Sequence, residues 1–188
     1  MRKFNVIYAD PPWQYGSKQY QDNGRPFDPL NRQYSTMSIE QIKKLPIKNI
    51  ADDNCALFMW CTDSHLKEGI EVMESWGFKY KTIAFVWIKK YKNGNICVNF
   101  APHTLKSSEI CLLGIRGTMK NYKKSNNVRQ LLEAVRIKHS QKPEEARIRI
   151  IELYGEIPKI ELFARQKSDG WSVWGDEVKS DLELTPIQ

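Results

Sequence analysis

The sequence has few of the residues that usually bind metals. Its 188 residues include three histidines and four cysteines, and no two cysteines form a C-x-x-C pair. Structural zinc sites use four closely spaced Cys or His ligands, so we expect no metal site. Cys55, Cys61 and Cys111 lie inside apolar runs, which predicts buried free thiols and no redox chemistry.

Long hydrophobic runs are also absent. No apolar run approaches the ~20 residues that a membrane-spanning helix needs, and no signal-peptide pattern follows Met1. The sequence contains no internal repeat and no domain linker. We therefore expect one domain, residues 1–188, located in the cytoplasm and without a membrane partner.

Positive charge and aromatic rings are plentiful. The net charge is +7, and aromatic residues make up 11% of the chain, including six tryptophans. Positive charge suits a polyanionic partner, and flat rings can stack on bases, so the combination favours nucleic acid. Many of these residues fall in three long polar segments, Gln14–Gln33, Lys89–Lys106 and Gly117–Asn127. Segments of this length without regular structure are usually functional or disordered.

Seven apolar segments are typical of strands. They are Asn5–Ala9, Ala56–Cys61, Thr82–Ile88, Glu109–Ile115, Leu131–Val135, Lys159–Ala164 and Ser172–Trp174. Helical patterns lie between several of them, at Ser38–Leu45, Ser64–Trp76 and Pro143–Tyr154. Ser38 and Gln41 form a capping-box pattern, and Leu66, Ile70 and Met73 share one helix face. Strands that alternate with helices predict an α/β fold with a largely parallel sheet.

The first predicted strand ends in the motif Asp10-Pro11-Pro12-Trp13. Open α/β sheets bind ligands at the carboxyl ends of their strands. The prolines lack N–H groups, so this turn offers rigid carbonyl acceptors beside the Asp10 carboxylate, a receptor for an amine with two hydrogens. Gripping both hydrogens would free the lone pair of a base's exocyclic amine for attack on an electrophile, with Trp13 as a flat surface for the base. The alternative is a strand that ends in a proline turn, with Trp13 in the core.

Eight short motifs follow one another along nearly the whole chain. They are "ADPPW" at 9–13, "YSTMS" at 34–38, "ALFMWCT" at 56–62, "FVWIKK" at 85–90, "SEICLLGIRG" at 108–117, "HSQKP" at 139–143, "KIELFAR" at 159–165 and "GWSVWGDE" at 170–177. In this series the sequence resembles the MT-A seventy family of adenine amino-methyltransferases, which contains the catalytic subunit of messenger-RNA adenine methyltransferase. The resemblance implies a Rossmann-like fold with a mostly parallel seven-stranded sheet that uses S-adenosylmethionine. It also implies a permuted order, with the catalytic motif first and the cofactor motifs within residues 139–177.

Charged residues in the C-terminal third suit this cofactor. Asp176 or Glu177 follows the last strand, where an acid can accept hydrogen bonds from ribose hydroxyls, and Lys142 precedes a helix start, where it can reach a carboxylate. Without the motifs, both would be ordinary solvated charges. The sequence departs from the family at Gly175-Asp176-Glu177, where Gly-Asn-acid or Gly-Asn-Gln is common, and in having no glycine-rich loop after "ELF".

The residue types, their positions and the resemblance together assign roles to single residues. The expected catalytic residues are Asp10, Pro11, Pro12 and Trp13. The expected cofactor-binding residues are Asp10, Lys142, Phe163, Arg165, Lys167, Ser168, Asp176 and Glu177. The candidate substrate-binding residues are Tyr34, Trp60, Trp87, Lys89 and Glu109. Trp60 and Trp87 lie in apolar strands and could equally belong to the core, whereas Lys89 directly follows such a strand and ranks above the loop lysines.

The leading hypothesis is a DNA adenine methyltransferase that acts alone or as a homodimer. A catalytic core without appended RNA-targeting regions fits a compact bacterial or phage-type enzyme, whose target base must be flipped out or single-stranded. An RNA adenine methyltransferase is the close alternative. A non-catalytic nucleic-acid-binding partner is an alternative of another class, although such a chain would be expected to have lost Asp10 or Trp13. Methylation of the cytosine amine uses the same chemistry and is a minor alternative.

Overall fold

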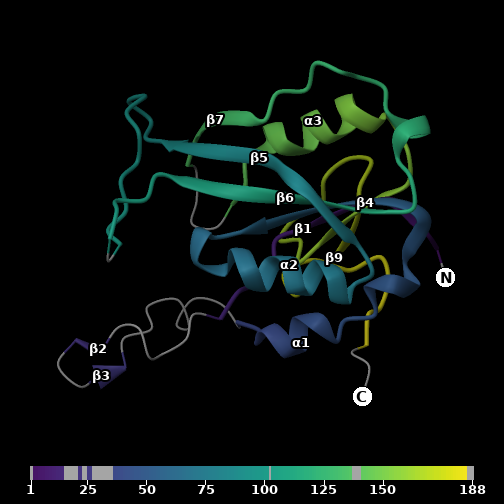
Figure 1. The fold of residues 1–188 in the computed structure, drawn as a ribbon, viewed down its shortest axis with the longest axis horizontal. Helices are drawn as coiled ribbons and strands as arrows, with labels where there is room; N and C mark the ends of the chain where they lie inside the picture. The colour runs from purple at the N-terminus through teal and green to yellow at the C-terminus, as the bar shows by residue number, and fades with distance from the viewer. Residues whose placement is uncertain are drawn as a thin grey trace.

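The fold is built around one seven-stranded sheet (Figure 1). The computed structural model describes residues 2–14, 36–101, 103–136 and 141–185, together with the backbone of 21–22 and 25–26. In spatial order the strands are β7 (Leu131–Val135), β5 (Lys79–Lys90), β6 (Ser108–Arg116), β4 (Ala51–Cys61), β1 (Phe4–Ala9), β8 (Lys159–Leu162) and β9 (Ser172–Trp174). Strand β6 is antiparallel to β4 and β5, and the other neighbouring pairs are parallel. The predicted α/β fold with a mostly parallel sheet is therefore confirmed.

Helices cover both faces of the sheet. Helices α1 (Ile39–Lys43) and α2 (Leu66–Ser75) lie on one face, and α3 (Glu144–Tyr154) lies on the other (Figure 1). The remaining described elements are short: η1 (Ile47–Asn49), η2 (Asp63–His65), η3 (Lys120–Tyr122) and the pair β2 (Gln21–Asp22) and β3 (Arg25–Pro26). Every residue of β1 is buried, because this central strand is covered on both faces. Such strands have near-continuous apolar sequences. Within the described part of the chain, no helix is long and apolar enough to cross a membrane.

The helix ends follow their local signals, with one difference. Ser38 Oγ accepts a hydrogen bond from the Gln41 N–H at 3.2 Å, and Gln41 Oε1 accepts one from the Ser38 N–H at 2.8 Å, so the predicted capping box is confirmed. Helix α2 begins at Leu66, after the η2 turn, rather than at Ser64. Met73 is buried as its helix face predicts, but Leu66 is 37% exposed because it lies in the first turn, at the margin of the core.

Several strands differ from their predicted extent, and β4 and β5 begin five and three residues earlier than expected. Strand β8 ends at Leu162, two residues earlier than predicted, because Phe163 has a φ of +60° and turns the chain. The segment predicted as a loop at 89–106 begins as the end of β5 and continues as an arm that projects beyond the sheet (Figure 1). Isolated bridges between Lys90 and Ile96 and between Asn99 and Lys106 hold this arm together. Most of the predicted loop at 14–33 lies outside the described residues.

All four cysteines are free and buried, which confirms the prediction of buried thiols. Burial raises the pKa of the Cys55 and Cys61 thiols to about 12, so both stay protonated at neutral pH. A protonated, enclosed thiol is a poor nucleophile. Across the described ranges, no three histidine, cysteine, aspartate or glutamate side chains are grouped to hold a metal ion.

Candidate active site

Four charged side chains meet at one edge of the sheet. Asp10 directly follows β1, and Lys89 is the second-last residue of β5, so both lie where these strands end. Glu109 is the second residue of β6, which is antiparallel to its neighbours and therefore begins at the same edge. Lys142 comes from the segment that precedes α3. Ligands of open α/β sheets bind at this edge, so the topology places the four charges where a ligand is expected.

These charges form a continuous row of ion pairs. Lys142 Nζ lies 2.6 Å from Asp10 Oδ2 and 3.3 Å from Glu109 Oε2. The other oxygen of Glu109, Oε1, lies 2.5 Å from Lys89 Nζ. Asp10 ends the row, and its side chain is 24% exposed, against 9% for Lys142. Its second oxygen, Oδ1, bonds to no residue in the described part of the chain, so it is available to a ligand.

The surroundings set the proton affinities along this row. Burial raises the pKa of the Asp10 carboxyl, and the Lys142 ammonium offsets that rise only in part. Burial would also raise the pKa of Glu109, but Lys142 and Lys89 together hold it below its usual value. Burial would lower the pKa of Lys142, but the two carboxylates raise it. Lys142 therefore stays charged beside both acids.

The proline motif is fixed by backbone hydrogen bonds. The Trp13 N–H donates to the Pro11 carbonyl at 2.9 Å, and the Met37 N–H donates to the Pro12 carbonyl at 2.9 Å. Each carbonyl oxygen has a second lone pair that can accept a further hydrogen bond. The turn beside Asp10 thus presents acceptors in fixed directions, as its prolines predict.

The tryptophans predicted to contact the base are buried. Trp13 is 7% exposed, Trp60 1% and Trp87 2%. Trp13 stacks on His65 with the ring centroids 5.7 Å apart, and its Nε1 donates to the Trp60 carbonyl at 3.1 Å. The Trp60 Nε1 donates to the Tyr8 hydroxyl at 2.7 Å. These rings therefore occupy the core, which was the alternative interpretation, and offer a base no open stacking surface. Tyr34, the other aromatic candidate, lies outside the described residues.

Trp60 and Trp87 still shape the row of charges. The Lys142 ammonium lies 5.8 Å from the Trp60 ring centroid, and the Lys89 ammonium lies 5.3 Å from that of Trp87. A cation is attracted to the face of an aromatic ring. The two indoles form a floor for the two lysines and so restrict the directions in which the ammonium groups can point.

A buried ion pair that the sequence did not predict supports this floor. Arg147 donates two hydrogen bonds to the Glu161 carboxylate, at 2.8 Å and 2.7 Å. The Arg147 guanidinium also lies 5.4 Å from the ring of Tyr8, whose hydroxyl holds Trp60. Helix α3 is thereby joined to β8 and to the tryptophan below Lys142. The sequence did contain a signal for this ion pair, an acid within the apolar strand "KIEL". A charge in a buried strand requires a partner.

The expected cofactor residues follow β8 and β9, which end side by side at this edge. Phe163 packs against Trp174 with the ring centroids 5.3 Å apart, and its left-handed φ of +60° redirects the chain. The Ala164 N–H donates to the Trp174 carbonyl at 2.9 Å. A Cβ at Gly175 would lie 2.2 Å from the Ala164 carbonyl oxygen, so only glycine allows the two segments to approach this closely.

Of the other cofactor candidates, only two contact each other. Arg165 Nε lies 3.4 Å from Glu177 Oε1, and the two side chains are 33% and 52% exposed. The structure thus brings Arg165 and Glu177 together at the rim. Lys167 instead pairs with Asp181 at 3.0 Å. The other two candidates are Ser168 and Asp176. Their side chains form no hydrogen bond or ion pair with a described residue.

Known proteins are similar to this sequence over most of its length. The profile of the MT-A70 family matches residues 4–177. The type II methyltransferase M.MunI of Mycoplasma is 35% identical over 100% of this chain and 83% of its own. The human N(6)-adenine-specific methyltransferase METTL4 is 30% identical over 94% of this chain. The human N(6)-adenosine-methyltransferase catalytic subunit METTL3 is 27% identical over 98% of it. The chain spans only 38% of METTL4 and 30% of METTL3. The extent of the profile match, and the share of M.MunI that is covered, establish that this protein belongs to the MT-A70 family.

Proposed function

We propose that the protein transfers a methyl group from S-adenosylmethionine to the exocyclic amino group of adenine in DNA. The observation that carries this proposal is the position of Asp10. Its carboxylate is held by Lys142 through Oδ2 at 2.6 Å, and Oδ1 has no partner in the described part of the chain. The fixed carbonyls of Pro11 and Pro12 follow it directly.

Asp10 acts by accepting a hydrogen bond from the amine. The lone pair of an adenine amine is delocalised into the ring, so the nitrogen is a weak nucleophile. Acceptors that grip its hydrogens, the Asp10 carboxylate and a proline carbonyl, favour a more tetrahedral nitrogen with a freer lone pair. As the nitrogen bonds to the methyl carbon and the bond from that carbon to the sulfonium sulfur breaks, the nitrogen would gain positive charge, which the adjacent carboxylate would stabilise until one amine proton is lost to water. Because Lys142 already fixes the carboxylate, little reorganisation is needed at that moment.

The residues at this edge fit S-adenosylmethionine, which supplies an electrophilic methyl group when bound. The Lys142 ammonium has three N–H donors, and Asp10 and Glu109 use two of them, so one remains for the carboxylate of the methionine part. Glu177, oriented by Arg165, offers oxygen acceptors for ribose hydroxyls. The absence of a glycine-rich loop after β8 suits a cofactor that carries no phosphate group.

Cofactor affinity provides a test of the Glu177 assignment. We expect Glu177→Ala to weaken binding of S-adenosylmethionine about tenfold or more, because hydrogen bonds to charged groups contribute about 1.5–3 kcal/mol. Isothermal titration calorimetry measures the change. Glu183→Ala, at another exposed acid near the C-terminal end, is the matched control and should bind normally. Equal affinity in the two variants would remove Glu177 from the cofactor site.

The pH dependence of methyl transfer tests the role of the row of charges. The ionised form of Asp10 is the active one and its pKa is raised, so activity should fall with decreasing pH at a midpoint above 3.8, the usual value for aspartate. Glu109 contributes to that rise. Glu109→Gln should therefore shift the acid limb of kcat/KM to lower pH. Glu133→Gln, which removes the partner of Lys90 outside the row, should leave the limb in place. An acid limb that stays unchanged or moves to higher pH in Glu109→Gln would contradict this electrostatic account.

The choice of DNA over RNA rests on the pattern of relatives. M.MunI, a type II methyltransferase, matches with 35% identity over most of its length, whereas METTL3, an adenosine methyltransferase, matches over less than a third. RNA remains the second candidate because METTL3 is a relative across nearly the whole of this chain. We expect higher kcat/KM on DNA than on RNA oligonucleotides of matched sequence at one salt concentration. Higher values on RNA across several sequences would overturn the choice of DNA and leave the amine chemistry standing.

A further inference from the structure

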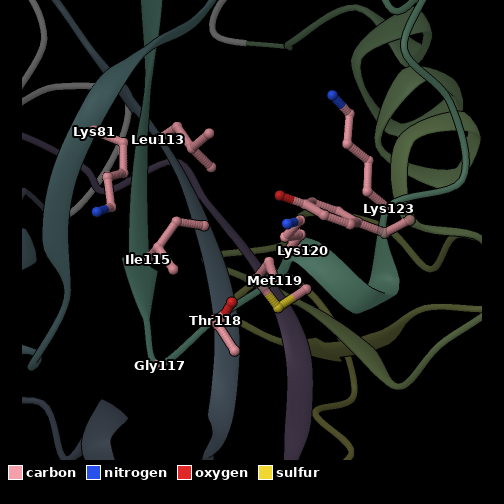
Figure 2. Close-up of a pocket in the computed structure, with 9 residues that line it drawn as sticks. Lys81, Leu113, Ile115, Gly117, Thr118, Met119, Lys120 and Lys123 are labelled. Atoms are coloured by element: carbon pink, nitrogen blue, oxygen red, sulfur yellow. The ribbon is translucent and has the colours of Figure 1, made fainter.

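A cavity lies at the opposite end of the strands from Asp10, because its lining residue Ile115 is near the end of β6, whose beginning faces Asp10. It has a volume of about 330 Å³ and opens between β5, β6 and the segment around η3 (Figure 2). Ile115 lines it, and Glu109 of the charged row lies six residues earlier in the same strand. Six residues of extended chain span about 20 Å, so the cavity is separate from the candidate active site.

The charges around this cavity have one sign. Lys81 reaches it from β5, Lys120 from η3 and Lys123 from the residues that follow, and no acidic residue lines it (Figure 2). None of the three lysines forms an ion pair or a side-chain hydrogen bond with a described residue. All three lysine side chains are exposed, and a bound anion would be attracted to their ammonium groups. The lysines in the row of ion pairs at the active-site edge differ, because neighbouring acids neutralise their positive charge.

The inner wall combines an apolar surface with one open hydroxyl. Leu113, Ile115 and Met119 supply the apolar surface. Tyr154, the last residue of α3, is only 5% exposed, and its ring packs against Phe58 at a centroid distance of 6.2 Å. Its hydroxyl bonds to no described residue. Every fully enclosed side-chain nitrogen or oxygen among the described residues has a hydrogen-bond partner, so this hydroxyl is not fully enclosed. The hydroxyl is therefore open to the cavity, and burial raises its pKa to about 12, which keeps it a donor.

We infer that this cavity binds a nucleoside phosphate. The lysines and the Tyr154 hydroxyl are all donors, which suits the acceptor oxygens of a phosphate group. The apolar surface of Leu113, Ile115 and Met119 suits a base or sugar. The volume lies at the lower end of the roughly 300–1,000 Å³ of small-ligand sites. The same chemistry is offered by a free mononucleotide and by a nucleotide unit of a nucleic-acid strand. Because the active site contributes no residue to this cavity, the inference stands apart from the proposed methyl transfer.

Amide NMR signals of the full chain, titrated with ADP, test this site. S-adenosylhomocysteine is kept at saturation to fill the cofactor site. ADP should shift the signals of Gly117 and Thr118, and binding should weaken with added salt. Adenosine, which has no phosphate, should bind at least tenfold more weakly. Asp10→Asn should bind ADP normally, so a failure of the proposed chemistry would not affect this result.

Variants separate a built site from general attraction to positive charge. Combined Lys120→Ala and Lys123→Ala should weaken ADP binding at least tenfold, and Tyr154→Phe should weaken it severalfold. Lys44→Ala, at an exposed lysine on the other face of the sheet, is the matched control and should have no effect. A single-stranded tetranucleotide that displaces ADP at lower concentration would assign the site to a nucleic-acid strand, and one that does not would assign it to free nucleotides. Unshifted Gly117 and Thr118 signals, or equal affinity in the double lysine variant and the control, would overturn the inference.

Discussion

Asp10→Asn should lower the rate of methyl transfer by about a hundredfold or more while leaving the fold intact. Loss of one preorganised electrostatic contact in an active site typically costs this much. Asparagine keeps the size of the side chain but has no negative charge to stabilise the amine as its nitrogen becomes positive. It also ends the 2.6 Å ion pair that orients the carboxylate through Lys142. Turnover with labelled S-adenosylmethionine measures the loss.

The matched control is Asp53→Asn. Asp53 is an aspartate near the beginning of β4, its side chain is 96% exposed, and its pairing with Arg116 at 3.7 Å lies far from the site. We expect near wild-type turnover from this variant and an unchanged melting temperature from both. If Asp10→Asn kept most of the wild-type rate, another group would have to hold the amine.

Arg147→Met should lower the free energy of unfolding by about 3–5 kcal/mol, the usual effect of removing one partner from a buried ion pair. The Arg147 and Glu161 side chains are 7% and 9% exposed and share two hydrogen bonds. Burial raises the pKa of Glu161 and Arg147 counteracts that rise, so the variant would leave a carboxyl with no compensating charge. Urea denaturation followed by circular dichroism measures the change.

A double variant provides the control for this prediction. Replacing both partners by apolar residues, Arg147→Met with Glu161→Leu, should recover most of the lost stability, because no buried charge then remains unpaired. Since Arg147 also packs over Tyr8, the double variant should still transfer methyl groups more slowly than the wild type. A loss below about 1 kcal/mol in Arg147→Met would show that the pair behaves like an exposed one.

Much of the fold could be predicted because the central strands are buried on both faces. Strand β1, for example, has a nearly continuous apolar sequence bounded by charged residues and prolines. The beginning of β4 was missed because Asp52 to Asn54 are polar and only partly buried. The left-handed conformation of Phe163, which ends β8, has no sequence signal, since phenylalanine rarely adopts it.

The site was only partly predictable for a different reason. The motifs pointed to Asp10, Lys89, Glu109 and Lys142 singly, but their row of ion pairs depends on the order of strands in the sheet. Asp10 and Lys142 are separated by 132 residues in the chain. The burial of Trp60 could not be settled either, because side-chain alternation carries no information when both faces of a strand are covered.

The central claim is that this chain places a methyl group on the exocyclic amine of adenine. The most direct measurement is mass spectrometry of the nucleosides released from DNA after incubation with the purified protein and S-adenosylmethionine that carries a deuterated methyl group. We expect the labelled methyl group on N6 of deoxyadenosine with the wild-type protein and about a hundredfold less of it with Asp10→Asn. Label on another base or another atom of adenine, or no label in DNA or RNA, would contradict the account.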